Sequence, residues 1–197
     1  MGAYGGPDII TDGLVLAVDA ASKRSYPGTG ATWYDLSGNN FDFTFGAGLS
    51  WNSAGTFSMT AATGAVLNAT ITASTTCTMQ FWIKTTDTQS LFWEPTASFV
   101  GAYRVDSKFY NGGGTGSPQY YQDLVLYNNI YDNLRDGEWH MVELKAVNLS
   151  SFTSHEFNNY GSYQFNSGEI ANIMIYDRNL TAAESKQNYN AQKNRFL

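Results

Sequence analysis

The recurrence of short strand-forming segments constrains the fold of this chain most strongly. Turn-forming residues separate these segments at intervals of about eight to twelve residues. Residues 41–45 alternate phenylalanine with polar residues, which is the period-two pattern of a strand. Residues 77–84 predict a central strand, with Met79 and Phe81 facing one side and Trp82 facing the other. Because no helix separates the strands, the pattern predicts an all-β fold of two antiparallel sheets packed as a sandwich.

The first and last strands of the pattern, at residues 13–19 and 169–176, are also rich in aliphatic residues. Between them, residues 56–60, 66–71 and 139–147 predict further strands. Each of these two strands is predicted to carry its aliphatic residues on one face. The residues predicted to share a face are Leu14, Leu16 and Val18 in the first strand and Ala171, Ile173 and Ile175 in the last.

A single helix is predicted near the end of the sequence. Thr181 and Glu184 have the spacing of a capping box, in which each side chain bonds the backbone N–H of the other residue. The helix should begin there and run to about Asn194. We expect it to cover an edge or an end of the sandwich.

The chain lacks a Pro-rich or Ser-rich linker and lacks a block of like charges, so we interpret residues 13–197 as one sandwich domain. Residues 1–12 form a Gly-rich arm without periodicity, which we expect to dock against a neighbouring subunit. The residues predicted to make this assembly contact are Tyr4, Pro7, Ile9 and Ile10.

The charge of the chain argues against nucleic-acid and membrane partners. The net charge is −6, and the 11 basic residues are scattered rather than clustered. The first residues show neither a basic region nor an apolar stretch of a signal peptide, so we expect synthesis in the host cytoplasm. The lone Cys77 enters an apolar strand, where a small buried hydrophobe is favoured over a reactive thiol.

Catalytic residues are not evident. Glycan hydrolases need two carboxylates that face one cleft, but Glu138 and Glu143 are spaced so that they would face opposite sides of a sheet. His140 lies within an apolar strand, where a packed or hydrogen-bonded histidine is favoured over a catalytic base. The sequence therefore predicts a protein that is not an enzyme.

A metal site is the weaker of two alternatives at the acidic loops. Asp123, Asp132 and Asp136 supply oxygen atoms of the kind that calcium prefers, but they lack the spacing of a calcium-binding loop. Solvated loop aspartates remain the favoured interpretation. We accordingly predict no cofactor and no metal, with calcium as the open alternative.

Tyrosine and asparagine gather between residues 103 and 131, around a glycine-rich loop. Aromatic faces stack on sugar rings and asparagine binds hydroxyl groups, but the same residues also suit a protein–protein contact or a plain sheet surface. The low charged fraction of 14% suits neutral partners. The residues predicted for this glycan- or partner-binding surface are Tyr103, Tyr110, Asn111, Tyr120, Tyr121, Tyr127 and Asn128.

Three segments, at residues 12–39, 137–142 and 170–190, together resemble one family. They are similar to the laminin-G-like, concanavalin A-type jelly-roll domains of structural proteins from tailed phages, including cyanophages. The resemblance implies a jelly-roll sandwich and a virion structural protein, displayed on the particle surface as capsid decoration or as a tail or fibre component.

The resemblance also implies partners: other virion proteins and further copies of this chain in a symmetric oligomer. The alternative function is a carbohydrate-binding adhesion module that recognises host surface polysaccharide. Residues 148–161 replace the short hairpin that follows the Trp-His strand in sugar-binding members of the family. That replacement favours the structural role over a lectin site.

Overall fold

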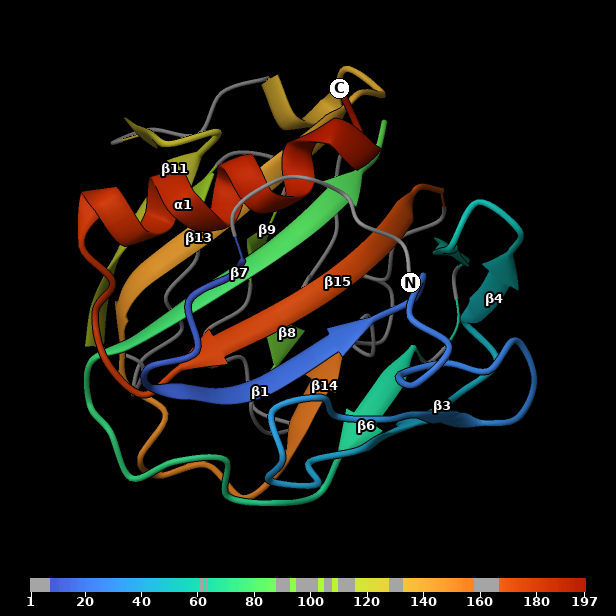
Figure 1. Cartoon of the computed structure of the whole chain (residues 1–197), viewed down its shortest axis with the longest axis horizontal. Coiled ribbons are helices and arrows are strands. Elements are labelled where there is room, and N and C mark those ends of the chain that lie inside the picture. The colour runs from blue at the N-terminus through green and yellow to red at the C-terminus, as the bar shows by residue number, and fades with distance from the viewer. Residues whose placement is uncertain are drawn as a thin grey trace.

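A computed structural model describes residues 8–60, 62, 64–87, 93–94, 103–104, 108–109, 116–127, 133–157 and 167–197. Its strands form two antiparallel sheets, which confirms the predicted sandwich (Figure 1). The larger sheet has the strand order β12-β11-β13-β7-β15-β5-β4, and β1 also pairs with β15. The smaller sheet has the order β2-β3-β6-β14-β8, and β9 pairs with β10 separately.

The larger sheet consists of β1 (Leu14–Asp19), β4 (Leu49–Asn52), β5 (Thr56–Met59), β7 (Cys77–Lys84), β11 (Gly116–Gln122), β12 (Val125–Tyr127), β13 (Trp139–Val147) and β15 (Glu169–Tyr176). The smaller sheet consists of β2 (Thr32–Trp33), β3 (Phe43–Phe45), β6 (Ala65–Leu67), β8 (Trp93–Glu94) and β14 (His155–Phe157). The separate pair is β9 (Tyr103–Arg104) and β10 (Lys108–Phe109). The helices are α1 (Ala182–Gln192) and two 3₁₀ turns, η1 (Asn133–Arg135) and η2 (Lys193–Arg195).

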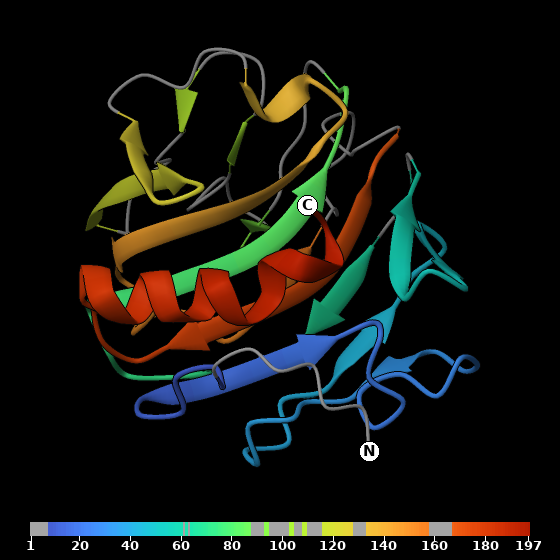
Figure 2. The ribbon, with the colours of Figure 1, turned by 45° about the horizontal axis from the view of Figure 1, so that its top comes forward.

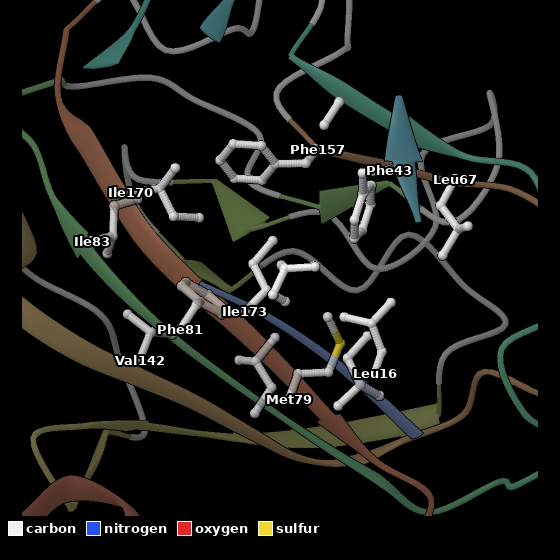
Figure 3. Close-up of a cluster of buried hydrophobic side chains, with 14 of the residues drawn as sticks. Leu16, Phe43, Leu67, Met79, Phe81, Ile83, Val142, Phe157, Ile170 and Ile173 are labelled. Carbon is white, nitrogen blue, oxygen red and sulfur yellow. The ribbon is translucent and has the colours of Figure 1, made fainter. Parts of the chain in front are cut away.

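The main core lies between the two sheets (Figure 3). Phe81 and Ile83 project from β7 of the larger sheet, and Phe43 and Phe157 project from the smaller one. These side chains are at most 1% exposed. Alternate residues of β7 point the other way, so Trp82 belongs to a second cluster on the outer face, as its sequence position predicts.

Two residues point outward and do not share the face of their aliphatic neighbours, contrary to the prediction. Leu14 and Ala171 pack in the clusters on the outer face of the larger sheet. The ladders shift register between Leu14 and Leu16 and between Ile170 and Asn172. Each irregularity inserts an extra residue and reverses the alternation on one side of it, so the predictions for Leu14 and Ala171 were wrong.

Helix α1 begins as predicted. Thr181 Oγ1 accepts from the Glu184 N–H at 3.3 Å, and Glu184 Oε2 accepts from the Thr181 N–H at 2.8 Å. Its predicted position was wrong, because the helix lies across the outer face of the larger sheet rather than at an edge (Figures 1 and 2). Tyr189 of the helix stacks on Trp82 of β7 with ring centroids 5.5 Å apart.

No helix among the described residues is long and apolar enough to cross a membrane. Cys77 is fully buried, as predicted, and burial raises the pKa of its thiol to about 11. Such a thiol remains protonated and unreactive at neutral pH.

Candidate binding cleft

Part of the outer face of the larger sheet is polar where α1 covers it, beside the apolar contact of Trp82 with Tyr189. Gln80 of β7 donates to Glu143 of β13 at 2.5 Å and accepts from Asn188 of the helix at 2.7 Å. Lys145 lies 3.3 Å from Glu143 and donates to the Leu180 carbonyl oxygen at 2.8 Å. All four side chains are buried. Their hydrogen bonds and ion pair replace the contacts with water that burial removes, which would otherwise be costly to lose.

Residues 8–11, which we call the strap, run over β15 between α1 and β1 (Figure 1). The Ile10 N–H donates to Asn188 Oδ1 at 2.8 Å, and the Tyr176 hydroxyl donates to the Ile10 carbonyl oxygen at 3.0 Å. A turn then leads into β1, closed by the Leu14 N–H on the Thr11 carbonyl oxygen. Gly13 supplies the positive φ of 74° that this turn requires.

A cleft of about 490 Å³ opens beside the strap, between β1, β15 and the end of α1. This volume is in the range of small-molecule binding sites. Aliphatic side chains make its floor: Ile9, Leu14, Ala17, Leu36 and Met174. Its polar lining residues, which we call the rim, are Asp8, Thr11, Asp19, Asn172, Gln192, Asn194 and Arg195. Of these, Asn172 and Gln192 are buried.

Some rim residues are paired with each other. Arg195 donates to Asp19 at 2.8 Å, and Asn172 donates to Gln192 at 2.7 Å. The side chains of Asp8, Thr11 and Asn194 form no hydrogen bond within the described part of the chain. The rim carries two carboxylates and one guanidinium, a net charge of −1. The cleft therefore offers a hydroxyl, an amide and a carboxylate above an aliphatic floor.

His140 lies at a different place, at the start of β13. Its Nδ1 is 2.6 Å from Asp123 Oδ2, and its Nε2 is 3.1 Å from Asp136 Oδ1. Burial opposes the charged imidazole, but the hydrogen bonds and charges of both carboxylates outweigh it and raise the pKa of His140. His140 is thus hydrogen-bonded, as its sequence context favours.

The same geometry bears on the calcium alternative. Asp123 and Asp136 both point at the His140 imidazole, and Asp132 lies outside the described residues. Across the described ranges, no group of three or more His, Cys, Asp or Glu side chains is placed to hold a metal ion. Glu143 is buried beneath α1 whereas Glu138 is exposed before β13, so these two carboxylates do not share a cleft.

The predicted tyrosine surface is described only in part. Tyr110, Asn111 and Asn128 lie outside the described residues, and for Tyr103 and Tyr127 only the strand pairing is described. Tyr120 is 3% exposed and packs in the main core, so its assignment to an exposed surface was wrong. Neighbouring residues of a strand face opposite sides, and Tyr121 accordingly lies on the other face, 5.1 Å beneath the Lys145 ammonium group.

The predicted assembly arm is also described in part, since Tyr4 and Pro7 lie outside the described residues. Ile9 and Ile10 pack on the chain's own Met174 and Tyr176. Both side chains are only partly buried by this packing, and their docking on a neighbouring subunit stays a prediction.

The cleft itself was not predicted. Asn194 is far in the sequence from Asp8 and Thr11, and the three residues follow no recognisable motif. The only available signal was the polar character of the predicted helix, since a helix without an apolar stripe must dock on a polar surface or face water.

Comparison with known proteins yields fold relatives and no family assignment. No protein-family model matches the chain, and no curated protein sequence matches it. A sialidase from Trypanosoma rangeli, bound to the inhibitor DANA, superposes with a TM-score of 0.61 at 14% identity, over 100% of this chain and 36% of the sialidase chain.

Two toxin domains are similar in the same way. The binding domain of botulinum neurotoxin serotype D gives a TM-score of 0.59 at 14% identity, over 93% of this chain and 53% of its own. The binding domain of Paraclostridial Mosquitocidal Protein 1 gives a TM-score of 0.57 at 13% identity, over 90% of this chain and 51% of its own. The chain thus spans between a third and about half of these structures, which share its β-sandwich fold. Because an enzyme and binding domains both contain this fold, the fold alone does not decide between catalysis and binding.

Proposed function

We propose that this chain is a non-enzymatic adhesion domain that binds a neutral glycan in the outer-face cleft. The observation that carries the proposal is the set of three polar side chains without hydrogen-bond partners in the described structure, Asp8, Thr11 and Asn194, above the aliphatic floor. A sugar ring presents hydroxyl groups at its edge and C–H groups on its face. Its hydroxyls match the rim, and its apolar face matches the floor.

Charge and fold relationships support the same class of ligand. The rim's net charge of −1 and the chain's net charge of −6 disfavour acidic sugars. Two of the fold relatives are binding domains of toxins, and another toxin relative is described as a receptor binding domain. The separation of Glu138 from Glu143 favours binding without hydrolysis.

The test is binding to an array of neutral and acidic glycans, followed by calorimetry with variants. Asn194→Ala and Asp8→Ala should each weaken binding to a neutral glycan about tenfold, the effect of one hydrogen bond lost from a protein–ligand contact. Tyr121→Ala, on the predicted tyrosine surface, is the matched control and should bind like the wild type. Loss of binding in Tyr121→Ala alone would move the site to that surface. Failure of every neutral glycan would refute the adhesion function.

We also propose that the domain is displayed on a tailed-phage virion as a symmetric homo-oligomer, on the capsid or as part of a tail or fibre. The three segments at residues 12–39, 137–142 and 170–190 support this proposal. Antibodies raised against the purified chain should label phage particles in negative stain, and the chain should sediment as an oligomer. A monomer that is absent from purified particles would contradict it.

A further inference from the structure

The strap is attached to the rest of the molecule through side chains. Within the described residues, its hydrogen bonds to the domain use Asn188, Tyr176 and Gln187, and ladder pairing starts only at Leu14 of β1. Segments held by few bonds outside a ladder open locally at a lower free energy than central strands do. The strap can therefore leave its position without unfolding of the sheet.

The groups that hold the strap are prearranged. Tyr176 and Asn188 are fully buried. Asn188 Nδ2 donates to the Tyr176 hydroxyl at 3.0 Å and to Gln80 at 2.7 Å. The hydroxyl in turn donates to the Ile10 carbonyl oxygen at 3.0 Å, a better acceptor than Met174 Sδ at 3.8 Å. Burial raises the pKa of Tyr176 above its usual range, so the hydroxyl stays a donor. When the strap leaves, both groups lose a partner, and this cost favours the docked position.

The strap also carries part of the binding site. Asp8 and Thr11, two of the three rim side chains without hydrogen bonds in the described structure, belong to it, and Ile9 lines the cleft beside them. A ligand in the cleft can contact these residues only while the strap is docked. The ligand then has a higher affinity for the docked state than for the open one, and the two equilibria are linked.

We infer that the strap is a ligand-coupled wall of the cleft, and that Tyr176 and Asn188 are positioning residues that set its docked geometry. This inference rests on the glycan function proposed above. It assigns ligand contacts to Asp8 and Thr11 and gives the buried pair an indirect role through Ile10. Glycan binding should hold the strap closed, and weakening the buried pair should open it.

The experiment is amide hydrogen exchange at Ile10 in the full chain, with and without a neutral trisaccharide. Maltotriose, cellotriose and laminaritriose serve as probes, and any one that binds is used. Without sugar, Tyr176→Phe should accelerate exchange at Ile10 about fivefold, because one hydrogen bond to the strap is lost. Ser185→Ala is the matched control, since Ser185 is buried on the same helix but bonds only Thr181. Its exchange at Ile10 should equal that of the wild type.

With sugar at ten times its dissociation constant, exchange at Ile10 should slow about tenfold. The Phe45 amide, which bonds the Ala31 carbonyl oxygen in the smaller sheet, should exchange by its own local opening and stay unchanged. Binding without slower exchange at Ile10 would overturn the coupling while leaving the glycan function intact. Where none of the three sugars binds, a neutral glycan that binds on the array replaces them, and failure of every neutral glycan on the array would overturn both. Unchanged exchange in Tyr176→Phe would remove the positioning role.

Discussion

The two faces of the larger sheet are built from the same strands but differ in chemistry. The inner face is aliphatic and aromatic, and it packs on the smaller sheet through residues such as Phe81. The outer face carries Gln80, Glu143 and Lys145, which are also buried but lie beneath a polar helix. Burial on the inner face removes apolar surface from water. Burial of these three polar side chains on the outer face instead replaces hydrogen bonds to water by hydrogen bonds within the protein, beside the apolar cluster around Trp82.

This difference separates stability from binding. Apolar packing is not directional, so it does not orient polar groups. Hydrogen bonds are directional, so the polar side chains of the outer face can orient further polar groups beside them. Asn188 bonds Gln80, the Tyr176 hydroxyl and the Ile10 N–H, and it thereby positions the strap. The strap in turn supplies part of the rim of the cleft. The outer face thus supplies the geometry of the candidate site, and we expect the inner face, with the larger apolar cluster, to supply most of the folding free energy.

The largest expected effect tests the inner face. Phe81→Ala should lower the free energy of unfolding by about 3–5 kcal/mol, through lost burial and the cavity that remains. Val125→Ala, at an apolar residue that is 56% exposed on the edge strand β12, should cost under about 0.5 kcal/mol. Urea unfolding followed by tryptophan fluorescence measures both. Similar costs for the two variants would mean that the inner face does not dominate stability.

The outer face should respond differently to single and double changes. Glu143→Leu leaves the buried Lys145 without its carboxylate partner and should cost about 3 kcal/mol. Adding Lys145→Met should restore most of that loss, because an apolar pair can replace a buried ion pair. Urea unfolding of the two single variants and the double variant gives the coupling energy. An additive double variant would show that the two charges do not stabilise each other.

The difference between the faces also explains what could be predicted from sequence. The alternation in β7 assigned Phe81 and Trp82 to their faces correctly, because apolar burial leaves a period-two pattern. Leu14 and Ala171 were misplaced because register shifts depend on pairing between distant strands, which no local pattern encodes. The capping box located the start of α1 but not the sheet face that the helix covers. The cleft joins residues 8–11 to residues near 194, and it forms only once the helix has docked.

A smaller effect tests how the outer face is covered. Thr181→Ala removes the N-cap of α1 and should cost about 1 kcal/mol. Hydrogen exchange should rise at the first helical amides, Glu184 among them, and remain unchanged in β7. Lys186→Ala, at an exposed position of the same helix, is the control and should change little. Equal acceleration in the helix and in β7 would indicate that the outer layer and the core unfold as one unit.

The smallest expected effect concerns the end of the inner face, where His140 pairs across the ladder with the buried Ile83. Asp123 and Asp136 raise the pKa of His140 in the folded state despite its burial. A raised pKa means that folding favours the protonated form. The stabilisation is therefore fully present below the unfolded pKa of about 6.5 and is lost as the pH rises through the folded-state value.

Urea unfolding of the wild type and His140→Gln at several pH values between 5.5 and 9 measures this contribution. At pH 5.5 the wild type should be more stable than His140→Gln by on the order of 1 kcal/mol, and this difference between the two proteins should shrink toward pH 9. His155 has the opposite pH dependence, because burial lowers its pKa to about 4, so acid destabilises the fold through it. That contribution is common to both proteins and cancels in the difference. A difference that stays constant with pH would show that His140 acts through packing alone, like its apolar neighbours on the inner face.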